Sequence, residues 1–228
     1  MRRPSPIRAR VALAAVAAAG LIALAAAGRA PAARDHAHHH AVPVAATDTA
    51  RAARFHDGMR RLWEDHITWT RLAIVSFAGG LGDLPATEGR LLRNQTDIAA
   101  AIRPYYGAAA SAKLRGLLRA HILGAVALLE AAKANDTAAL GRAHDAWYAN
   151  GNAIADFLAS ANPRHWPRAE MRSMMKTHLD ETLKEAVDRL SGRFAADVRD
   201  YDSVHRSILD MADMLSAGIV AQFPARFR

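Results

Sequence analysis

The stretch RGLLRAHILGA, residues 115–125, places a histidine among leucines at the spacing of a helix. Leu117, Leu118, His121 and Ala125 recur every three or four residues, so they lie on one face of the predicted helix. That face is otherwise apolar and predicts a core position for a titratable ring. Such a ring needs a partner, because a buried polar group left unpaired costs about 1–3 kcal/mol.

The same outline occurs twice more along the chain. RRLWEDHITWT contains His66 and RSMMKTHLDET contains His178, each preceded by two large apolar residues at the offsets of Leu117 and Leu118. Each of these helical segments is followed, at a similar distance, by a second segment that contains NQTDI, NGNAI or DMADM. The three pairs of segments predict three helical hairpins with a weak internal repeat.

Turn-forming residues separate the helical segments at AGGLGDLP, RPYYG, ANDTAAL and ANPRHWP. In RPYYG, Pro104 and Gly107 predict the end of the second helix, before a third begins near Ala109. No stretch alternates apolar and polar residues with period two, so no strand is expected. The predicted fold of residues 51–228 is all-α, an antiparallel bundle of about six helices built from the three hairpins.

The first 34 residues predict export. They contain a basic head, an apolar run from Val11 to Ala27 and then small residues, which is the layout of a secretory signal peptide. As a helix the apolar run would be about 25 Å long, shorter than the ~30 Å hydrocarbon core, so cleavage is favoured over retention as an N-terminal membrane anchor. Residues 35–50 include DHAHHH and predict a His-rich flexible linker. We expect an extracytoplasmic protein, either secreted or anchored to the cytoplasmic membrane.

The formal net charge of +8 is concentrated near the N-terminus. Six arginines precede Asp35, the first acidic residue, and the rest of the chain is nearly balanced. It contains no basic stripe interleaved with aromatic residues, so no nucleic-acid partner is expected. The chain has no cysteine, which excludes disulfides, thiol nucleophiles and cysteine-ligated metal sites. It also lacks the Gly-x-Ser-x-Gly, Gly-x-x-x-x-Gly-Lys and His-Glu-x-x-His motifs, so catalysis is not expected.

Two interpretations of the three histidines are open. In the preferred one, each histidine hydrogen-bonds an Asn or Asp of its own hairpin and thereby fixes the register of two otherwise similar apolar helices. The expected pairs are His66 with Asn94 or Asp97, His121 with Asn150, and His178 with Asp210 or Asp213.

In the second interpretation, the histidines and neighbouring carboxylates hold a divalent transition metal inside the bundle. Imidazole and carboxylate are ligands that zinc, iron or copper accepts. The candidate ligands are His66, His121, His178, Glu181, Glu185, Asp97 and Asp213. The chain has no Glu-x-x-His unit, two of which a ferritin-like di-iron centre requires. The identity of a cofactor or ligand, like the oligomeric state, is left open.

Aromatic residues and methionines lie on the same helices. Trp63, Trp69, Trp147 and Tyr148 could line a ligand pocket, but core packing is the preferred interpretation. The methionines near the C-terminus, Met171, Met174, Met175, Met211 and Met214, are likewise interpreted as adaptable packing between helices.

Several strings together resemble a family of exported bacterial all-helical proteins. They are LWEDHITWTR, LLRNQTDIAAAI, PYYG, WYANGNAIADFL, HLDET and MADMLSAGIVAQFP, and they cover about residues 62–224. The resemblance brings no established reaction. The family pattern has an acidic residue where this chain has Asn152, which weakens a metal site that needs a carboxylate there. The expected function is binding or an envelope-associated interaction; the alternatives are metal binding and an unrecognised envelope hydrolase or transferase.

Overall fold

The computed structural model describes residues 50–228. This part of the chain forms five α-helices and a terminal 3-10 turn: α1 (Ala50–Gly79), α2 (Leu84–Ala134), α3 (Thr137–Ala161), α4 (Arg168–Leu190), α5 (Phe194–Gln222) and η1 (Pro224–Arg226). Residues 50–228 contain no strand, which confirms the all-α prediction. The predicted signal peptide or anchor and nearly all of the predicted linker lie outside the described residues.

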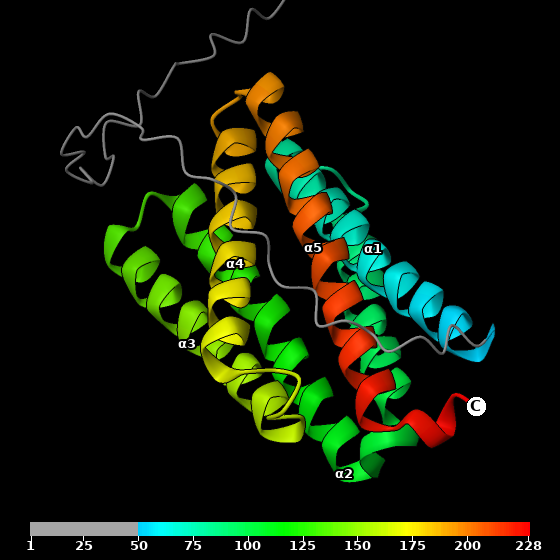
Figure 1. Ribbon diagram of the computed structural model, residues 1–228. Coiled ribbons are helices and arrows are strands. Elements are labelled where there is room, and N and C mark those ends of the chain that lie inside the picture. Colours follow the sequence, from blue (N-terminus) through cyan, green and yellow to red (C-terminus); the bar gives the residue numbers. More distant parts are fainter. Residues whose placement is uncertain (1–49) are drawn as a thin grey trace, which may run out of the picture. The chain divides into compact units, whose positions relative to one another are not determined.

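Neighbouring helical segments pack side by side in opposite directions, and α2 reverses its direction partway along its length (Figure 1). In chain order, α1 packs on α2, α2 on α3, α3 on α4 and α4 on α5. The last helix returns to the first, because α5 packs on α1, and α4 also touches α1. The contact between α1 and α4 joins elements far apart in sequence, and it positions the site described below.

Helix α2 is interrupted at Gly107, whose φ of 83° and ψ of 176° are not helical. Glycine adopts this conformation freely, whereas other residues rarely do. The helix resumes at once, and the hydroxyl of Ser111 donates to the carbonyl of Ala99 across the break at 2.7 Å. Residues twelve apart lie about 18 Å apart along a continuous helix, so this bond shows that the chain turns back at Gly107 and that the two arms of α2 pack side by side near the break (Figure 1). The predicted break at RPYYG is therefore a reversal of the chain within α2, although the count of six helices is not confirmed.

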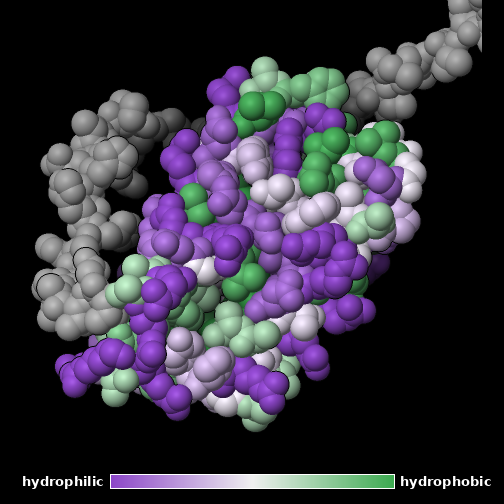
Figure 2. Space-filling model, turned by 90° about the vertical axis from the view of Figure 1, so that its right-hand side faces the viewer, coloured by the Kyte–Doolittle hydropathy of each residue, from purple (hydrophilic) through white to green (hydrophobic). Residues whose placement is uncertain are grey.

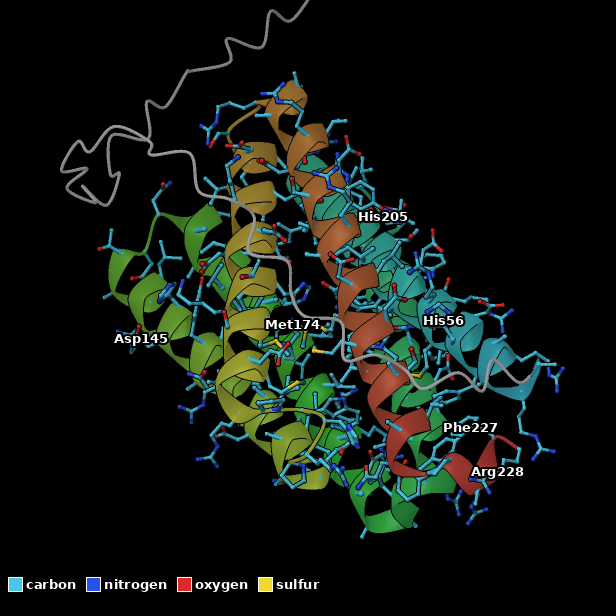
Figure 3. All side chains as sticks on the ribbon, viewed as in Figure 1. His56, Asp145, Met174, His205, Phe227 and Arg228 are labelled. Carbon is cyan, nitrogen blue, oxygen red and sulfur yellow. The ribbon has the colours of Figure 1, made fainter. Side chains whose placement is uncertain are left out.

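The core of the bundle contains large apolar side chains from all five helices. Those with almost no exposed surface include Ile67, Ile98, Ile154, Trp166, Met171, Leu179, Ile208, Met211 and Ile219. Trp63, Trp147 and Met175 are also buried, and Met174 lies at the α4–α5 side of the bundle among other sulfur atoms (Figure 3). Most of the predicted aromatic and methionine packing positions therefore belong to the core, as expected from the hydrophobic effect.

The surface of the bundle is mostly polar. On the face shown in Figure 2, hydrophilic side chains predominate and hydrophobic ones form small separate groups. The large apolar residues with substantial exposure are Leu72, Leu81, Leu123, Val187, Phe194 and Val198. Among the described helices, none combines the length and the apolar character needed to cross a membrane.

Candidate functional site

Three histidines from three helices converge inside the bundle. His66 on α1 is 3% exposed, and His121 on α2 and His178 on α4 are each 4% exposed. The ring centres of His66 and His178 are 5.8 Å apart, and those of His121 and His178 are 6.0 Å apart. In the preferred interpretation of the sequence, each histidine bonds within its own hairpin, whereas the second places the three together. The structure brings the three rings together, with His178 next to both of the others.

Each histidine occupies the same place on the buried stripe of its helix. The residues seven and three positions before it, and the residue one position after it, are buried in all three cases. They are Met59, Trp63 and Ile67 around His66; Leu114, Leu118 and Ile122 around His121; and Met171, Met175 and Leu179 around His178. These offsets follow the helical period, so the apolar neighbours that bury one side of each helix also turn its imidazole inward.

The three rings line a cavity of about 60 Å³ between α1, α2, α3 and α4. Its walls are mainly apolar and include Ile74, Phe77, Leu91, Ile122, Leu128 and Leu183. Glu88, which is partly exposed, is the one carboxylate among the lining residues. The indole of Trp147 stacks on His121, with ring centres 5.3 Å apart, and its Nε1 donates to the carbonyl of His121 at 3.1 Å. The cavity therefore combines an apolar wall with three imidazoles and little fixed charge.

The hydroxyl groups in the cavity are already bonded. Thr70 Oγ1 donates to the carbonyl of His66 at 2.8 Å, and Thr182 Oγ1 donates to the carbonyl of His178 at 2.8 Å. Each threonine follows its histidine by four residues, so both bonds are local to a helix turn. Neither hydroxyl proton is directed at an imidazole.

The hydrogen bonds of the imidazoles differ among the three rings. His66 Nδ1 lies 3.1 Å from Gln95 Nε2, which also donates to the carbonyl of Leu91 at 3.0 Å. Because the Gln95 nitrogen is a donor, His66 Nδ1 is an acceptor and the neutral ring carries its proton on Nε2. His121 is within hydrogen-bonding reach of the Asn150 side chain, whereas the Nδ1 atom of His178 is buried without a hydrogen-bond partner in the described part of the chain.

Burial keeps all three imidazoles neutral. It lowers the pKa of His66 to about 3, with a further contribution from the charge of His121. Burial also lowers the pKa of His121 to about 4, against a smaller opposing influence of Asn150. The pKa of His178 is held well below its usual value by burial and by the charges of His66 and His121. At neutral pH each ring therefore keeps a nitrogen lone pair free of a proton.

Two asparagines of the expected register pairs bond backbone carbonyls of the neighbouring helix. Asn94 Nδ2 donates to the carbonyl of Leu62 at 2.9 Å, and Asn150 Nδ2 donates to the carbonyl of Leu117 at 3.2 Å. Each carbonyl belongs to the residue four positions before the histidine of that helix. The two asparagines thus tie neighbouring helices together through the backbone, since an amide group reaches a carbonyl as readily as it reaches a ring. His66 bonds Gln95 in place of Asn94 or Asp97.

The other two histidines differ. His121 is within hydrogen-bonding reach of Asn150, its expected partner, and His121 Nδ1 and Asn150 Oδ1 are the buried atoms of the two side chains that have no other partner. On α5, Asp210 is exposed, and Asp213 pairs with Arg60 at 2.6 Å. The C-terminal hairpin therefore supplies no carboxylate to His178.

The predicted carboxylate ligands are not gathered around the histidines. Asp97 is exposed, and Asp213 also pairs with His56 at 2.9 Å. His56 lies on α1 (Figure 3). Glu181 accepts a hydrogen bond from Ser207 at 2.5 Å. Glu185 lies in a different buried cluster. Within residues 50–228, no group of three or more His, Asp or Glu side chains is placed so that it could hold a metal ion together.

That second cluster was missed by the sequence analysis. Glu185 on α4 and Asp197 on α5 are each 0% exposed, and both pair with Arg71 of α1. Arg71 Nη1 lies 2.9 Å from Glu185 Oε1, and Nη2 lies 2.8 Å from Asp197 Oδ2. Burial raises the pKa of Glu185 to about 7, against the opposing effect of Arg71. The cluster joins three helices, and a single arginine at helical spacing gives no sequence signal for it.

No family model matches the chain, and no match is found among curated proteins or solved structures. The resemblance to exported helical proteins is therefore still a prediction from the motifs.

Proposed function

We propose that this protein is an exported binding protein whose ligand site is the cavity between His66, His121 and His178. The observation that carries the proposal is the convergence of three buried imidazoles from separate helices on one cavity. A buried polar group without a partner costs about 1–3 kcal/mol. A ligand that bonds these imidazoles would offset part of the cost of burying them, and the same site would account for three inward-facing imidazoles on separate helices.

The chemistry of the cavity favours binding over catalysis. A general base works best when its pKa lies near the working pH, whereas the pKa values of His66 and His121 are about 3 and about 4. Nucleophilic catalysis also needs a hydroxyl or amine next to the base. The hydroxyls of Thr70 and Thr182 donate to backbone carbonyls. A hydrolase or transferase would therefore need a nucleophile other than these two hydroxyls.

The proposal includes the three-hairpin organisation and the extracytoplasmic location. The matching buried offsets around the three histidines and the matching bonds of Asn94 and Asn150 support an internal repeat. The basic and apolar leader of residues 1–34 supports export, with membrane association through that segment if it is retained. The nearly balanced charge after the leader supports a site for a small ligand and not for nucleic acid.

Native mass spectrometry of untagged protein from the extracytoplasmic fraction of the native host tests this proposal. We expect a mature chain that begins between Gly28 and Asp35, together with a stoichiometric noncovalent component. The component should be lost from the His178→Leu variant, in which an apolar side chain of similar size replaces the imidazole and both ring nitrogens are absent. It should be retained by His144→Leu, because that histidine lies at the surface and outside the cavity lining.

Two results would contradict the proposal. A wild-type chain with no bound component would contradict the existence of a ligand site. A component that persists in His178→Leu would place the site elsewhere.

A further inference from the structure

We infer that the ligand of the triple-histidine cavity is a linear aliphatic molecule with an uncharged oxygen group at one end, of the class of the long-chain alcohols. Its oxygen lies at the imidazoles, and its hydrocarbon chain extends from them along the bundle. The inference rests on the proposed binding function and specifies the class of the ligand. The direction, width and lining of the cavity and the neutral state of its imidazoles support this class.

The cavity is elongated because three of its walls follow helices that run in the same direction. Helix α1, the arm of α2 after Gly107 and helix α4 all run upward in Figure 1. On each of them the lining begins at a histidine and continues toward the C-terminal end of the helix: from His66 to Phe77, from His121 to Leu129 and from His178 to Ala186. These steps of 8 to 11 residues span about 12–16 Å at a rise of about 1.5 Å per residue. The histidines therefore lie at one end of a long cavity.

The other end of the cavity is open to solvent. Phe77 and Leu129 are half-buried there, whereas the three histidines are buried. Lys133 is exposed beside Phe77, since its Nζ donates to the Phe77 carbonyl at 2.9 Å and lies 4.7 Å from the centre of the ring. Glu88 lies in the second turn of α2, close to the turn that follows α1, so it belongs to the same end. Glu88 and Lys133 therefore mark the open end, and the imidazoles form the closed one.

The cavity has the width of a single hydrocarbon chain. The centre of a water-sized sphere can occupy about 60 Å³ of it. Spread along about 12 Å, this volume is a path about 5 Å across once the sphere's own radius of about 1.4 Å is included. Carbon atoms in contact lie about 3.5–4.0 Å apart, so one methylene chain fits such a path. A ring needs more room, because an engineered apolar cavity that binds benzene measures about 150 Å³.

The lining between the imidazoles and the open end is apolar. It includes Ile74, Leu91, Ile122, Leu128 and Leu183, with Ala73, Ala125 and Ala186 among them. The hydroxyls of Thr70 and Thr182 already donate to carbonyls of their own helices. A hydrocarbon chain gains free energy with each methylene that it buries here, whereas a polar chain would lose its hydration without compensation. The lining therefore favours a hydrocarbon chain.

The polar end of the ligand is uncharged. Burial lowers the pKa values of His66 and His121 to about 3 and about 4, so both rings are neutral at neutral pH. A carboxylate or an ammonium group beside them would lose its hydration without gaining a counter-charge. Because His66 Nδ1 accepts from Gln95, the proton of the neutral ring is on Nε2, which can donate to an oxygen. A hydroxyl oxygen accepts this proton without bringing charge into the bundle.

The test is isothermal titration calorimetry of the full chain with 1-hexanol, 1-octanol, 1-decanol and 1-dodecanol at neutral pH. The protein is first unfolded and refolded so that any bound component is removed. We expect one alcohol per chain and an affinity that rises about fourfold with each added methylene, which corresponds to about 0.8 kcal/mol per buried CH₂. The rise should stop at about ten carbons, because a chain of that length spans about 12 Å and reaches the open end. Octanoate and octylammonium should bind at least about a hundredfold more weakly than 1-octanol.

Two alanine variants locate the chain. Ala125→Leu adds bulk to the lining one turn beyond His121, so 1-decanol should bind this variant no better than 1-hexanol does. Ala127→Leu adds the same bulk at an exposed position of the same helix, outside the lining, and should leave the whole series unchanged. Circular dichroism establishes that each variant is folded. If Ala125→Leu does not fold, Ala73→Leu takes its place, because Ala73 is a half-buried lining residue on α1.

The outcomes separate this inference from the function on which it rests. An affinity that does not depend on chain length, or equal binding of 1-octanol and octanoate, would overturn the inference. Equal losses in Ala125→Leu and Ala127→Leu would place the chain outside the cavity and also contradict it. A component in native mass spectrometry that is lost in His178→Leu, together with no binding of alcohols, would overturn the aliphatic class and leave the binding function intact. A bare wild-type chain that also binds no alcohol would overturn both.

Discussion

Acidification from pH 7 to pH 5 is expected to cost the folded domain about 4 kcal/mol through His66 and His121, with a further loss through His178. Each has a folded-state pKa below the ordinary value of 6.5. Below pH 6.5 the histidines of the unfolded chain therefore bind protons, whereas those of the folded chain do not. The stability that the neutral histidines contribute above pH 6.5 is lost as the pH falls toward the folded pKa values. A histidine whose folded pKa is about 4 or lower contributes about 2 kcal/mol of this loss by pH 5.

Glu185 works in the opposite direction. Its pKa is raised from 4.5 to about 7, so the folded state binds this proton more tightly than the unfolded state does. Its contribution is fully present below pH 4.5 and is lost as the pH rises through 7, which offsets about 2 kcal/mol of the histidine effect at pH 5. Urea unfolding monitored by circular dichroism at the two pH values measures the net change.

Two variants separate these contributions. His178→Leu should reduce the acid-dependent loss by about one histidine's share, and Glu185→Gln should enlarge the loss, because it removes the group that opposes it. Equal free energies of unfolding at pH 7 and pH 5, in both the wild type and Glu185→Gln, would show that the imidazoles are not buried as described.

Replacement of Arg71 with methionine is expected to lower the free energy of unfolding by about 3–5 kcal/mol at neutral pH. Arg71 is the partner of two carboxylates, Glu185 and Asp197, that have no exposed surface. Without it, these groups must stay charged in an apolar interior or take up protons, and both are costly. Arg189 lies 3.4 Å from Asp197 but forms no bond to Glu185, so it cannot replace Arg71.

Two further variants test the cause of this effect. Arg172→Met breaks the pair with Asp156 at the surface, and it should change stability little because water screens exposed pairs. In the Arg71→Met background, replacing Glu185 and Asp197 with leucine should restore most of the lost stability, since no fully buried charge is left unpaired and Arg189, which loses Asp197, is partly exposed to water. Equal effects of Arg71→Met and Arg172→Met in urea unfolding would contradict the buried cluster.

The helical period was enough to place each histidine on a buried face. Met59, Trp63 and Ile67 surround His66 at offsets that can be counted in the sequence, and the same holds at His121 and His178. The helical period does not show which helix faces pack against each other. His66 and His178 are neighbours because α4 touches α1. That contact depends on the packing of the whole bundle, so the spacing within one helix does not show which histidines become neighbours.

The polar partners of His66 and His121 were predicted on the right helices, but the backbone acceptors were not predicted. Asn94 and Asn150 do link neighbouring helices, but through the carbonyls of Leu62 and Leu117. Every residue has a carbonyl, so sequence spacing cannot identify that kind of acceptor. Gln95 could have been found, because it lies on the same helical face as its buried neighbours Leu91 and Ile98.

The carboxylates on α4 show the limit of arguments from a single helix face. His178, Glu181 and Glu185 follow one another at helical spacing, yet a buried face is more than 100° wide and meets several neighbouring helices. Glu181 accordingly bonds Ser207 of α5, and Glu185 bonds Arg71 of α1. In α2, Gly107 and Pro104 signalled the break correctly, but the residues that follow continue directly as helix.

The most direct measurement of the central claim is an NMR titration of the imidazole nitrogens in 15N-labelled full-length protein. Signals from His66, His121 and His178 are assigned by their disappearance in single His→Gln variants. We predict that all three rings stay neutral at every pH at which the chain is folded, with no protonation as the pH passes 6.5, the ordinary histidine pKa. Protonation of any of the three near pH 6.5 in the folded protein would contradict a cavity lined by three buried, neutral histidines.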